Sequence, residues 1–179
     1  MKTALVLIVS GPDRPGIVER VASTVLAHEG SWLEARMARL AGRFAGVVSI
    51  TVPTANIPAL RRALDALPAE GLTILVEEAD ANDPGPGEGR AVLLELTGSD
   101  REGIVKEVST VLAKRGVNME EMVTRRREAP MAGGMLFELQ AQLRTPLDLP
   151  LDTLREALEA LSSELAVDIA LGELEPSES

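Results

Sequence analysis

The hydrophobic residues of this chain follow two alternating periods, and the order of the periods predicts the elements. Apolar side chains at every second position, or in a short unbroken run, indicate a strand, whereas a spacing of three or four residues indicates a helix. In the first half the predicted order is strand, helix, strand, strand, helix, strand. These elements cover residues 2–9, 17–30, 32–40, 44–52, 57–67 and 72–76, with Gly30 as the predicted C-cap of the first helix. The first strand is apolar almost throughout, which is typical of a strand in the middle of a sheet.

The second half of the chain repeats this order. Its predicted strands cover 91–97, 117–127, 134–143 and 167–171, and its predicted helices cover 104–116 and 151–161. Because split βαβ units form the ferredoxin-like arrangement, the predicted fold class is α+β: two βαββαβ units in tandem, each with an antiparallel sheet and its helices on one face. The open face and the edges of each sheet then need a cover, either the neighbouring unit or a second chain.

A nine-residue stretch supports the duplication, because it stands between the first strand and the first helix of both units. Residues 10–18 read Ser-Gly-Pro-Asp-Arg-Pro-Gly-Ile-Val, and residues 97–105, 87 positions later, read Thr-Gly-Ser-Asp-Arg-Glu-Gly-Ile-Val. The leucine spacing of the second helix returns at Leu151, which lies 94 positions after Ile57. The seven additional residues belong either to the hairpin of the second unit or to 144–150.

The repeat divides the chain into two small domains. We predict domains at 1–79 and 91–174, a linker rich in Pro, Gly and Asp at 80–90, and an acidic tail at 175–179. The linker composition is typical of solvated, irregular chain, because it contains no apolar period that could be buried.

Composition and charge exclude several functions. The 179 residues include no Cys, which excludes disulfides and thiolate metal sites and makes the cytoplasm the expected location. No apolar run is long enough for a membrane span. The formal net charge is −10, divided as −1 over 1–80 and −9 over 81–179, and the basic cluster Arg125–Arg127 is followed at once by Glu128. Direct binding of nucleic acid normally needs a basic face, so we expect none.

The corner between the first strand and the first helix is the best candidate for a ligand site in each unit. Glycine lets a ligand approach the backbone closely, and the helix N-terminus offers N–H groups to a carboxylate. Asp13 or Asp100 could take a ligand ammonium, so an amino acid would match both features. The alternative is structural: each Asp caps its helix, and each Gly serves only the turn.

This set of features resembles the ACT domain, a regulatory module that binds amino acids. The residues that carry the resemblance are a strand, the motif Gly-x-Asp-Arg-x-Gly-Ile-Val, a helix and then Gly-x-Asn at 116–118. The tandem pair, which fills the chain apart from the linker and tail, is similar to the glycine cleavage system transcriptional repressor family. The resemblance implies a protein that is not an enzyme and that binds a small amino acid, glycine in that family, at an interface between ACT modules.

Carried over by position, the resemblance implies a set of ligand-binding residues in each unit. They are Gly11, Asp13, Arg14, Gly16 and Ile17 in the first unit, and Gly98, Asp100, Arg101, Gly103, Ile104, Asn118 and Met119 in the second. The first unit departs from the motif, because it has Ser31-Trp32-Leu33 where the second has Val117-Asn118-Met119. The second unit therefore matches the family better, although Glu102 stands in it where Pro15 stands in the first.

Regulation of transcription would pass through a protein partner, because the charge argues against contact with DNA, and we expect a homo-oligomer. Two other functions stay open. One is an assembly module that binds no small ligand. The other is an acyl phosphate hydrolase with Arg101 and Asn118 as its anion-binding residues, although the neighbouring Asp100 would repel a phosphate. The sequence contains no phosphate-binding loop, nucleophile–base pair or metal-ligand spacing, so we predict no catalytic residue, cofactor or metal.

Overall fold

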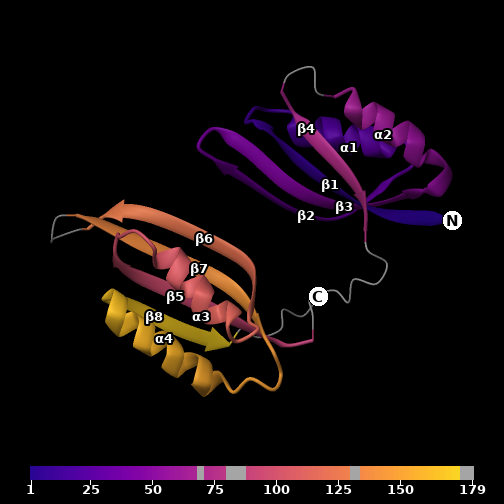
Figure 1. Cartoon of the computed structure of the whole chain (residues 1–179). Coiled ribbons are helices and arrows are strands. Elements are labelled where there is room, and N and C mark those ends of the chain that lie inside the picture. Colours follow the sequence, from indigo (N-terminus) through magenta and orange to yellow (C-terminus); the bar gives the residue numbers. More distant parts are fainter. Residues whose placement is uncertain (68–70, 80–87, 130–133, 174–179) are drawn as a thin grey trace. The chain divides into compact units, whose positions relative to one another are not determined.

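The computed structural model describes residues 1–67, 71–79, 88–129 and 134–173. The chain divides into two compact units, Met1–Asp83 and Pro84–Ser179, each with its own core (Figure 1). This division falls within the predicted linker 80–90. Most of the linker lies outside the described residues, as does the predicted acidic tail 175–179.

The first unit is a four-stranded antiparallel sheet with the strand order β2-β3-β1-β4. Its elements are β1 (Lys2–Pro12), α1 (Ile17–Ala27), β2 (Ser31–Leu40), β3 (Arg43–Pro53), the short 3₁₀ turn η1 (Thr54–Asn56), α2 (Ile57–Asp65) and β4 (Thr73–Glu78). The nearly continuous apolar strand β1 is central, with β3 on one side and β4 on the other, as its sequence predicts.

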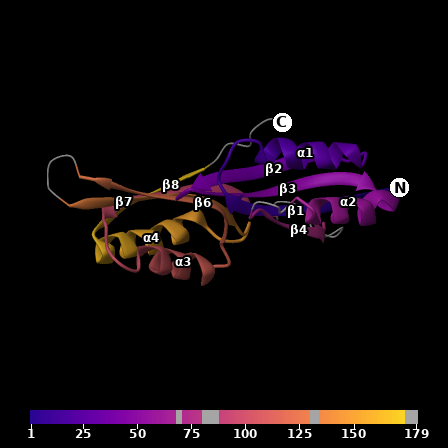
Figure 2. The same cartoon turned by 90° about the horizontal axis from the view of Figure 1, so that it is seen from above.

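The second unit has the same topology, in the order β6-β7-β5-β8. Its elements are β5 (Arg90–Ser99), α3 (Ile104–Ala113), β6 (Asn118–Glu128), β7 (Met135–Thr145), α4 (Leu151–Leu165) and β8 (Val167–Glu173). Figure 2 shows α3 and α4 on the same side of this sheet. The predicted fold class is therefore confirmed: two ferredoxin-like α+β units in tandem.

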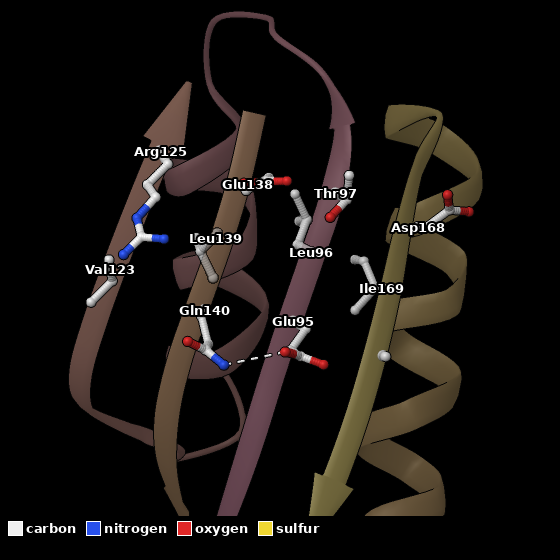
Figure 3. Close-up of a pocket in the computed structure, with 11 residues that line it drawn as sticks. Glu95, Leu96, Thr97, Val123, Arg125, Glu138, Leu139, Gln140, Asp168 and Ile169 are labelled. Atoms are coloured by element: carbon white, nitrogen blue, oxygen red, sulfur yellow. Dashed lines mark hydrogen bonds between the residues drawn. The ribbon is translucent and has the colours of Figure 1, made fainter. Parts of the chain in front are cut away.

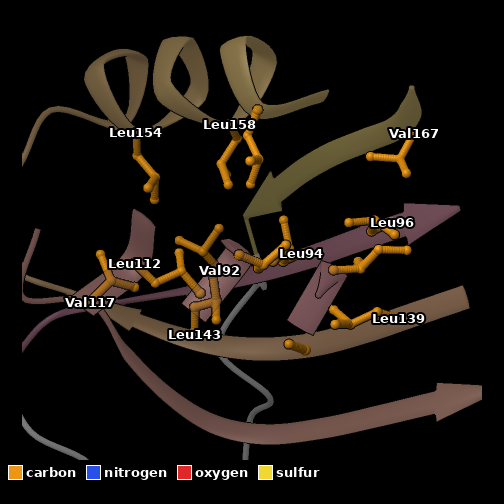
Figure 4. Close-up of a cluster of buried hydrophobic side chains, with 14 of the residues drawn as sticks. Val92, Leu94, Leu96, Leu112, Val117, Leu139, Leu143, Leu154, Leu158 and Val167 are labelled. Atoms are coloured by element: carbon orange, nitrogen blue, oxygen red, sulfur yellow. The ribbon is translucent and has the colours of Figure 1, made fainter. Parts of the chain in front are cut away.

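Each core lies between one sheet face and two helices, because alternate strand residues meet a helical stripe. In the second unit Leu94 on β5 is fully buried, as are Leu154 and Leu158 on α4 (Figure 4). In the first unit Leu7 and Leu60 are buried in the same way. Each such side chain stabilises the fold by about 1.5–3 kcal/mol relative to its exposed state. These layers fix the end of the first strand relative to the helix that follows it.

The strand register locates the seven additional residues of the second unit. Arg39 pairs with Phe44, five positions on, whereas Arg126 pairs with Phe137, eleven positions on. Six of the additional residues therefore lie in the β6–β7 hairpin. The seventh lies between β7 and α4, because the buried Leu154 is 94 positions after Leu60. The sequence alone left this choice open.

The first helix ends earlier than predicted, and Gly30 has a different role. Helix α1 ends at Ala27, and the left-handed residue after it is Glu29, with φ 60°. Its counterpart after α3 is Gly116, with φ 68°. Gly30 is needed for space instead, because a Cβ there would lie 2.6 Å from Cγ1 of Val25.

Candidate functional site

The two predicted corners have the same backbone conformation. Gly16 and Gly103 precede α1 and α3 with φ of 91° and 94°, a left-handed conformation that glycine adopts without steric cost. A Cβ on either glycine would meet nothing within 4 Å, so the space beside both turns is open. Conformation, and not crowding, requires glycine here, and no side chain fills either corner at this point.

Gly11 and Gly98 have a different role from the corner glycines. A Cβ on Gly98 would lie 2.4 Å from Cγ1 of Val167, and a Cβ on Gly11 would lie 3.0 Å from the carbonyl oxygen of Gly71. Both glycines therefore let the last strand of their unit pack against the first. This contact gives them a structural reason to be glycine that needs no ligand.

The aspartates of the motif form ion pairs with arginines of the second strand. Oδ2 of Asp13 lies 2.6 Å from Nε of Arg39, and Oδ2 of Asp100 lies 2.5 Å from Nη2 of Arg126. Arg126 lies 87 positions after Arg39, so the pair is duplicated with the motif. The sequence analysis missed both arginines as partners. Applying the 87-residue offset to the arginines could have found them.

A backbone hydrogen bond holds each corner to the neighbouring hairpin. The N–H of Asp13 donates to the carbonyl of Gly42 at 2.9 Å, and the N–H of Asp100 donates to that of Met135 at 2.8 Å. With the ion pair, each corner is thus fixed at two points. The structural alternative, in which the aspartates cap the helices, is wrong: within the described residues, neither α1 nor α3 has a side-chain hydrogen bond at its N-cap.

The remaining corner residues differ in their access to a ligand. Ile17 and Ile104 are only 6% and 2% exposed, and both belong to the hydrophobic cores. Their side chains therefore pack into the core at the start of the helix. Arg14 is half-buried, whereas Arg101 is exposed beside the open space at Gly103.

Asn118 and Met119 lie far from the corner of their own unit. Asn118 pairs with Arg144, which pairs with Ala91 at the start of β5, whereas Gly98 is seven residues further along that strand. At about 3.3 Å per residue, this separation is about 23 Å. One unit therefore does not bring the corner and the start of β6 together, and a site containing both would need residues from two units.

A β-bulge marks the start of the second strand in both units. The extra residue is Leu33 in β2 and Glu120 in β6, at equivalent positions. Leu33 is exposed, but Glu120 forms a two-pronged ion pair with Arg144, with Nε–Oε1 and Nη2–Oε2 distances of 3.0 and 3.1 Å. Trp32, before the first bulge, packs against the core. The units therefore differ at this end of the sheet.

The second unit also has a depression of about 510 Å³ on the sheet face opposite its helices (Figure 3). Its lining includes Thr97, Arg125 and Asp168, together with Glu95, which accepts a hydrogen bond of 3.2 Å from Gln140. The depression reaches Thr97, the first residue of the duplicated stretch, and was not predicted from sequence. Among the residues that the structure describes, no group of three His, Cys, Asp or Glu side chains could hold a metal ion.

The first unit resembles a known family in sequence. The first unit matches the ACT domain family over residues 3–77, and the second repeats its topology and corner. The chain therefore consists of two ferredoxin-like units in tandem, of which the first matches the ACT domain family. None of the helices in the described ranges is long and apolar enough to cross a bilayer.

Two crystal structures resemble the chain over nearly its full length. An unknown protein from Galdieria sulphuraria is 31% identical, with a TM-score of 0.86 and coverage of 98% of this chain and 100% of that one. A "putative glycine cleavage system transcriptional repressor" is 20% identical, with a TM-score of 0.70 and coverage of 98% and 99%. The second likeness shows the fold alone. No curated protein matches the chain.

Proposed function

We propose that this protein is an amino-acid sensor that regulates a protein partner and catalyses no reaction. The observation that carries the proposal is the duplicated corner, in which a left-handed glycine beside open space adjoins an Asp–Arg ion pair. The match of the first unit to the ACT domain family supports it, because this resemblance implies an amino-acid ligand. Glycine is the proposed ligand, since the open space lies directly against backbone.

The corner offers complementary groups to a zwitterion. The N–H groups in the first turn of α1 or α3 would receive the ligand carboxylate, because the helix N-terminus is partly positive. The ion pair occupies Oδ2 of Asp13 or Asp100, so the ligand ammonium would bind Oδ1. In this proposal Arg39 and Arg126 hold the aspartate side chains in place.

Ligand binding would be linked to the packing of neighbouring modules. Because Asn118 and Met119 are about 23 Å along the sheet from their own corner, they would contact a ligand held by the corner of another unit. The ligand would then favour the arrangement in which both halves of the site meet. It shifts that equilibrium only by its difference in affinity for the two arrangements.

The regulated process is proposed to be transcription of glycine cleavage or other amino-acid metabolism, in the cytoplasm and through a protein partner. The net charge of −10 disfavours direct contact with DNA. The acyl phosphate hydrolase is disfavoured by geometry, because Arg101 stands at one end of β5 and Asn118 pairs near the other. Those two residues would have to bind the same phosphate.

Calorimetry and thermal unfolding with each of the twenty amino acids test the proposal. We expect heat and stabilisation with glycine, about 2.7 kcal/mol when its concentration is 100 times Kd. Asp100→Asn should weaken binding, whereas the control Asp152→Asn, an exposed aspartate that is ion-paired with Arg155 at the start of α4, should not. If no amino acid produces heat or a thermal shift, the protein is not a sensor and the assembly module is favoured.

A further inference from the structure

Charges of opposite sign lie at the two sides of the depression on the second sheet (Figure 3). Arg125 lies on the edge strand β6, whereas Glu95 lies on β5 and Asp168 on the other edge strand, β8. The volume of about 510 Å³ falls within the range of about 300–1,000 Å³ that small-molecule sites commonly occupy. The depression is therefore large enough for a small molecule and offers it both signs of charge.

Part of this charge is not neutralised within the protein. Glu138 is paired with Arg127, whose Nε lies 2.5 Å from Oε1 of the carboxylate. Glu95 accepts a hydrogen bond of 3.2 Å from a neutral side-chain amide. Arg125 and Asp168 have no ion pair or side-chain hydrogen bond to any residue that the structure describes. Within the described ranges, the depression thus presents one guanidinium and two carboxylates without a partner of opposite charge.

The charged lining belongs to the second unit and is not required by the fold. The charged positions of the depression correspond in the first sheet to uncharged residues: Glu95 to Ile8, Glu138 to Ala45, Asp168 to Thr73 and Arg125 to Ala38. Glu95 is also a diagonal neighbour of Glu138 and Asp168 on the adjacent strands. Because like charges on neighbouring strands repel each other, a bound cation would relieve a repulsion that the first sheet does not have.

The spacing of the strands indicates how far apart the charges of a ligand must be. Arg125 and Asp168 lie in the same row across the sheet, with β7 and β5 between them. At about 4.8 Å per strand, their backbone positions are about 14 Å apart. Side chains stand roughly perpendicular to a sheet, so the two charged groups stay well separated. They match a ligand whose carboxylate and cation stand at opposite ends of a chain, and not one in which both groups share a carbon atom, as in glycine.

We propose that the depression is a second ligand site, which binds a small molecule with a carboxylate at one end and an ammonium or guanidinium group at the other. A basic amino acid has this form, and its two cations and one carboxylate match the two carboxylates and one guanidinium of the site. The ligand carboxylate binds the guanidinium of Arg125 through two parallel hydrogen bonds. The side-chain cation lies between Glu95 and Asp168.

Calorimetry of the full chain with lysine and with two analogues, each lacking one charge, tests this proposal. Norleucine lacks the side-chain ammonium, and 1,5-diaminopentane lacks the carboxylate. We expect lysine to bind and each analogue to bind at least about tenfold more weakly, because each leaves one side of the depression unpaired. If lysine does not bind, or if norleucine binds as tightly, the proposal is wrong.

Two substitutions locate the site. Arg125→Gln and Glu95→Gln change exposed side chains, and each should weaken the binding of lysine at least about tenfold. Arg125→Gln should leave the binding of 1,5-diaminopentane unchanged, because this analogue has no carboxylate. The matched controls are Arg155→Gln and Asp152→Asn on α4, which make the same charge changes on the opposite side of the sheet. Equal losses in the controls would show a general attraction to an acidic chain and would overturn the proposal.

Competition with glycine separates this site from the corner. An excess of glycine should not displace lysine, because the lining of the depression does not include the corner residues Asp100 and Gly103. Displacement of lysine by glycine would mean that lysine binds at the corner, which would contradict the proposal. Failure of glycine to bind at all would count against the sensor function alone, so the two proposals are tested independently.

Discussion

The two units have nearly the same backbone plan, but they differ in the surfaces they present. Both keep the left-handed glycine before the helix and the Asp–Arg pair beside it. They diverge on the open sheet face, where Ile8 in one corresponds to Glu95 in the other, and at the bulge, where Leu33 corresponds to Glu120. The corner is therefore the feature that the two units share, whereas the side chains on their open sheet faces and at their bulges differ.

The largest expected effects test whether the two units unfold independently of each other. Leu7 and Leu94 occupy equivalent, fully buried positions in two different cores. Replacing either by Ala should destabilise its own unit by about 2–5 kcal/mol, because the truncation leaves a cavity. Calorimetric unfolding should show that Leu94→Ala lowers only one transition and Leu7→Ala only the other. An equal shift of both transitions by either variant would mean that the units unfold together.

Effects of intermediate size are expected for Gly98 and Gly11, the two glycines that face the last strand of their unit, and the two effects should differ. Gly98→Ala should destabilise the second unit by about 1–3 kcal/mol, because its Cβ would lie 2.4 Å from Val167 and force the strands apart. Gly11→Ala should cost less, since its closest contacts are at 3.0 Å. Urea unfolding measures both. Gly172→Ala, whose Cβ would meet nothing within 4 Å, serves as the control, and an effect there as large as that of Gly98→Ala would refute the packing argument.

The smallest expected effect concerns the duplicated ion pair. Arg39→Ala and Arg126→Ala should each lower the free energy of unfolding by about 1 kcal/mol or less, because both arginines are largely exposed. The loss at Arg126 should be the larger, since the side chain of Asp100 is 22% exposed and that of Asp13 is 31% exposed. Unfolding in high salt should reduce both losses. Losses that do not change with salt would point to packing as their origin.

Most of the fold could be predicted from sequence because its signals are local. The apolar run of β1, the helical spacing from Ile17 and the repeat at 97–105 each lie within a short stretch and are confirmed in position and order. The role of Gly30 was predicted wrongly, because its close contact with Val25 depends on how the chain turns after α1 and not on a local preference for glycine.

Less of the candidate site could be predicted, because its contacts are not local. The Asp13–Arg39 ion pair joins residues of two different elements, and no hydrophobic period relates their positions in the sequence. The distance between Asn118 and its own corner follows from the register of three strands, which hydrophobic pattern alone does not determine. Motif matching selects residue types, and only topology shows which of them lie at the same end of a sheet.

The attachment of each corner to the hairpin has a consequence for how this architecture can change. Asp13 donates a hydrogen bond to Gly42 in the turn between β2 and β3, and Asp100 donates one to the equivalent Met135 at the start of β7. The six additional residues of the second unit precede Met135 in the sequence of the hairpin. The corner keeps the same left-handed glycine and Asp–Arg ion pair with and without these residues. The hairpin of this architecture can therefore change in length while the conformation of the corner stays the same.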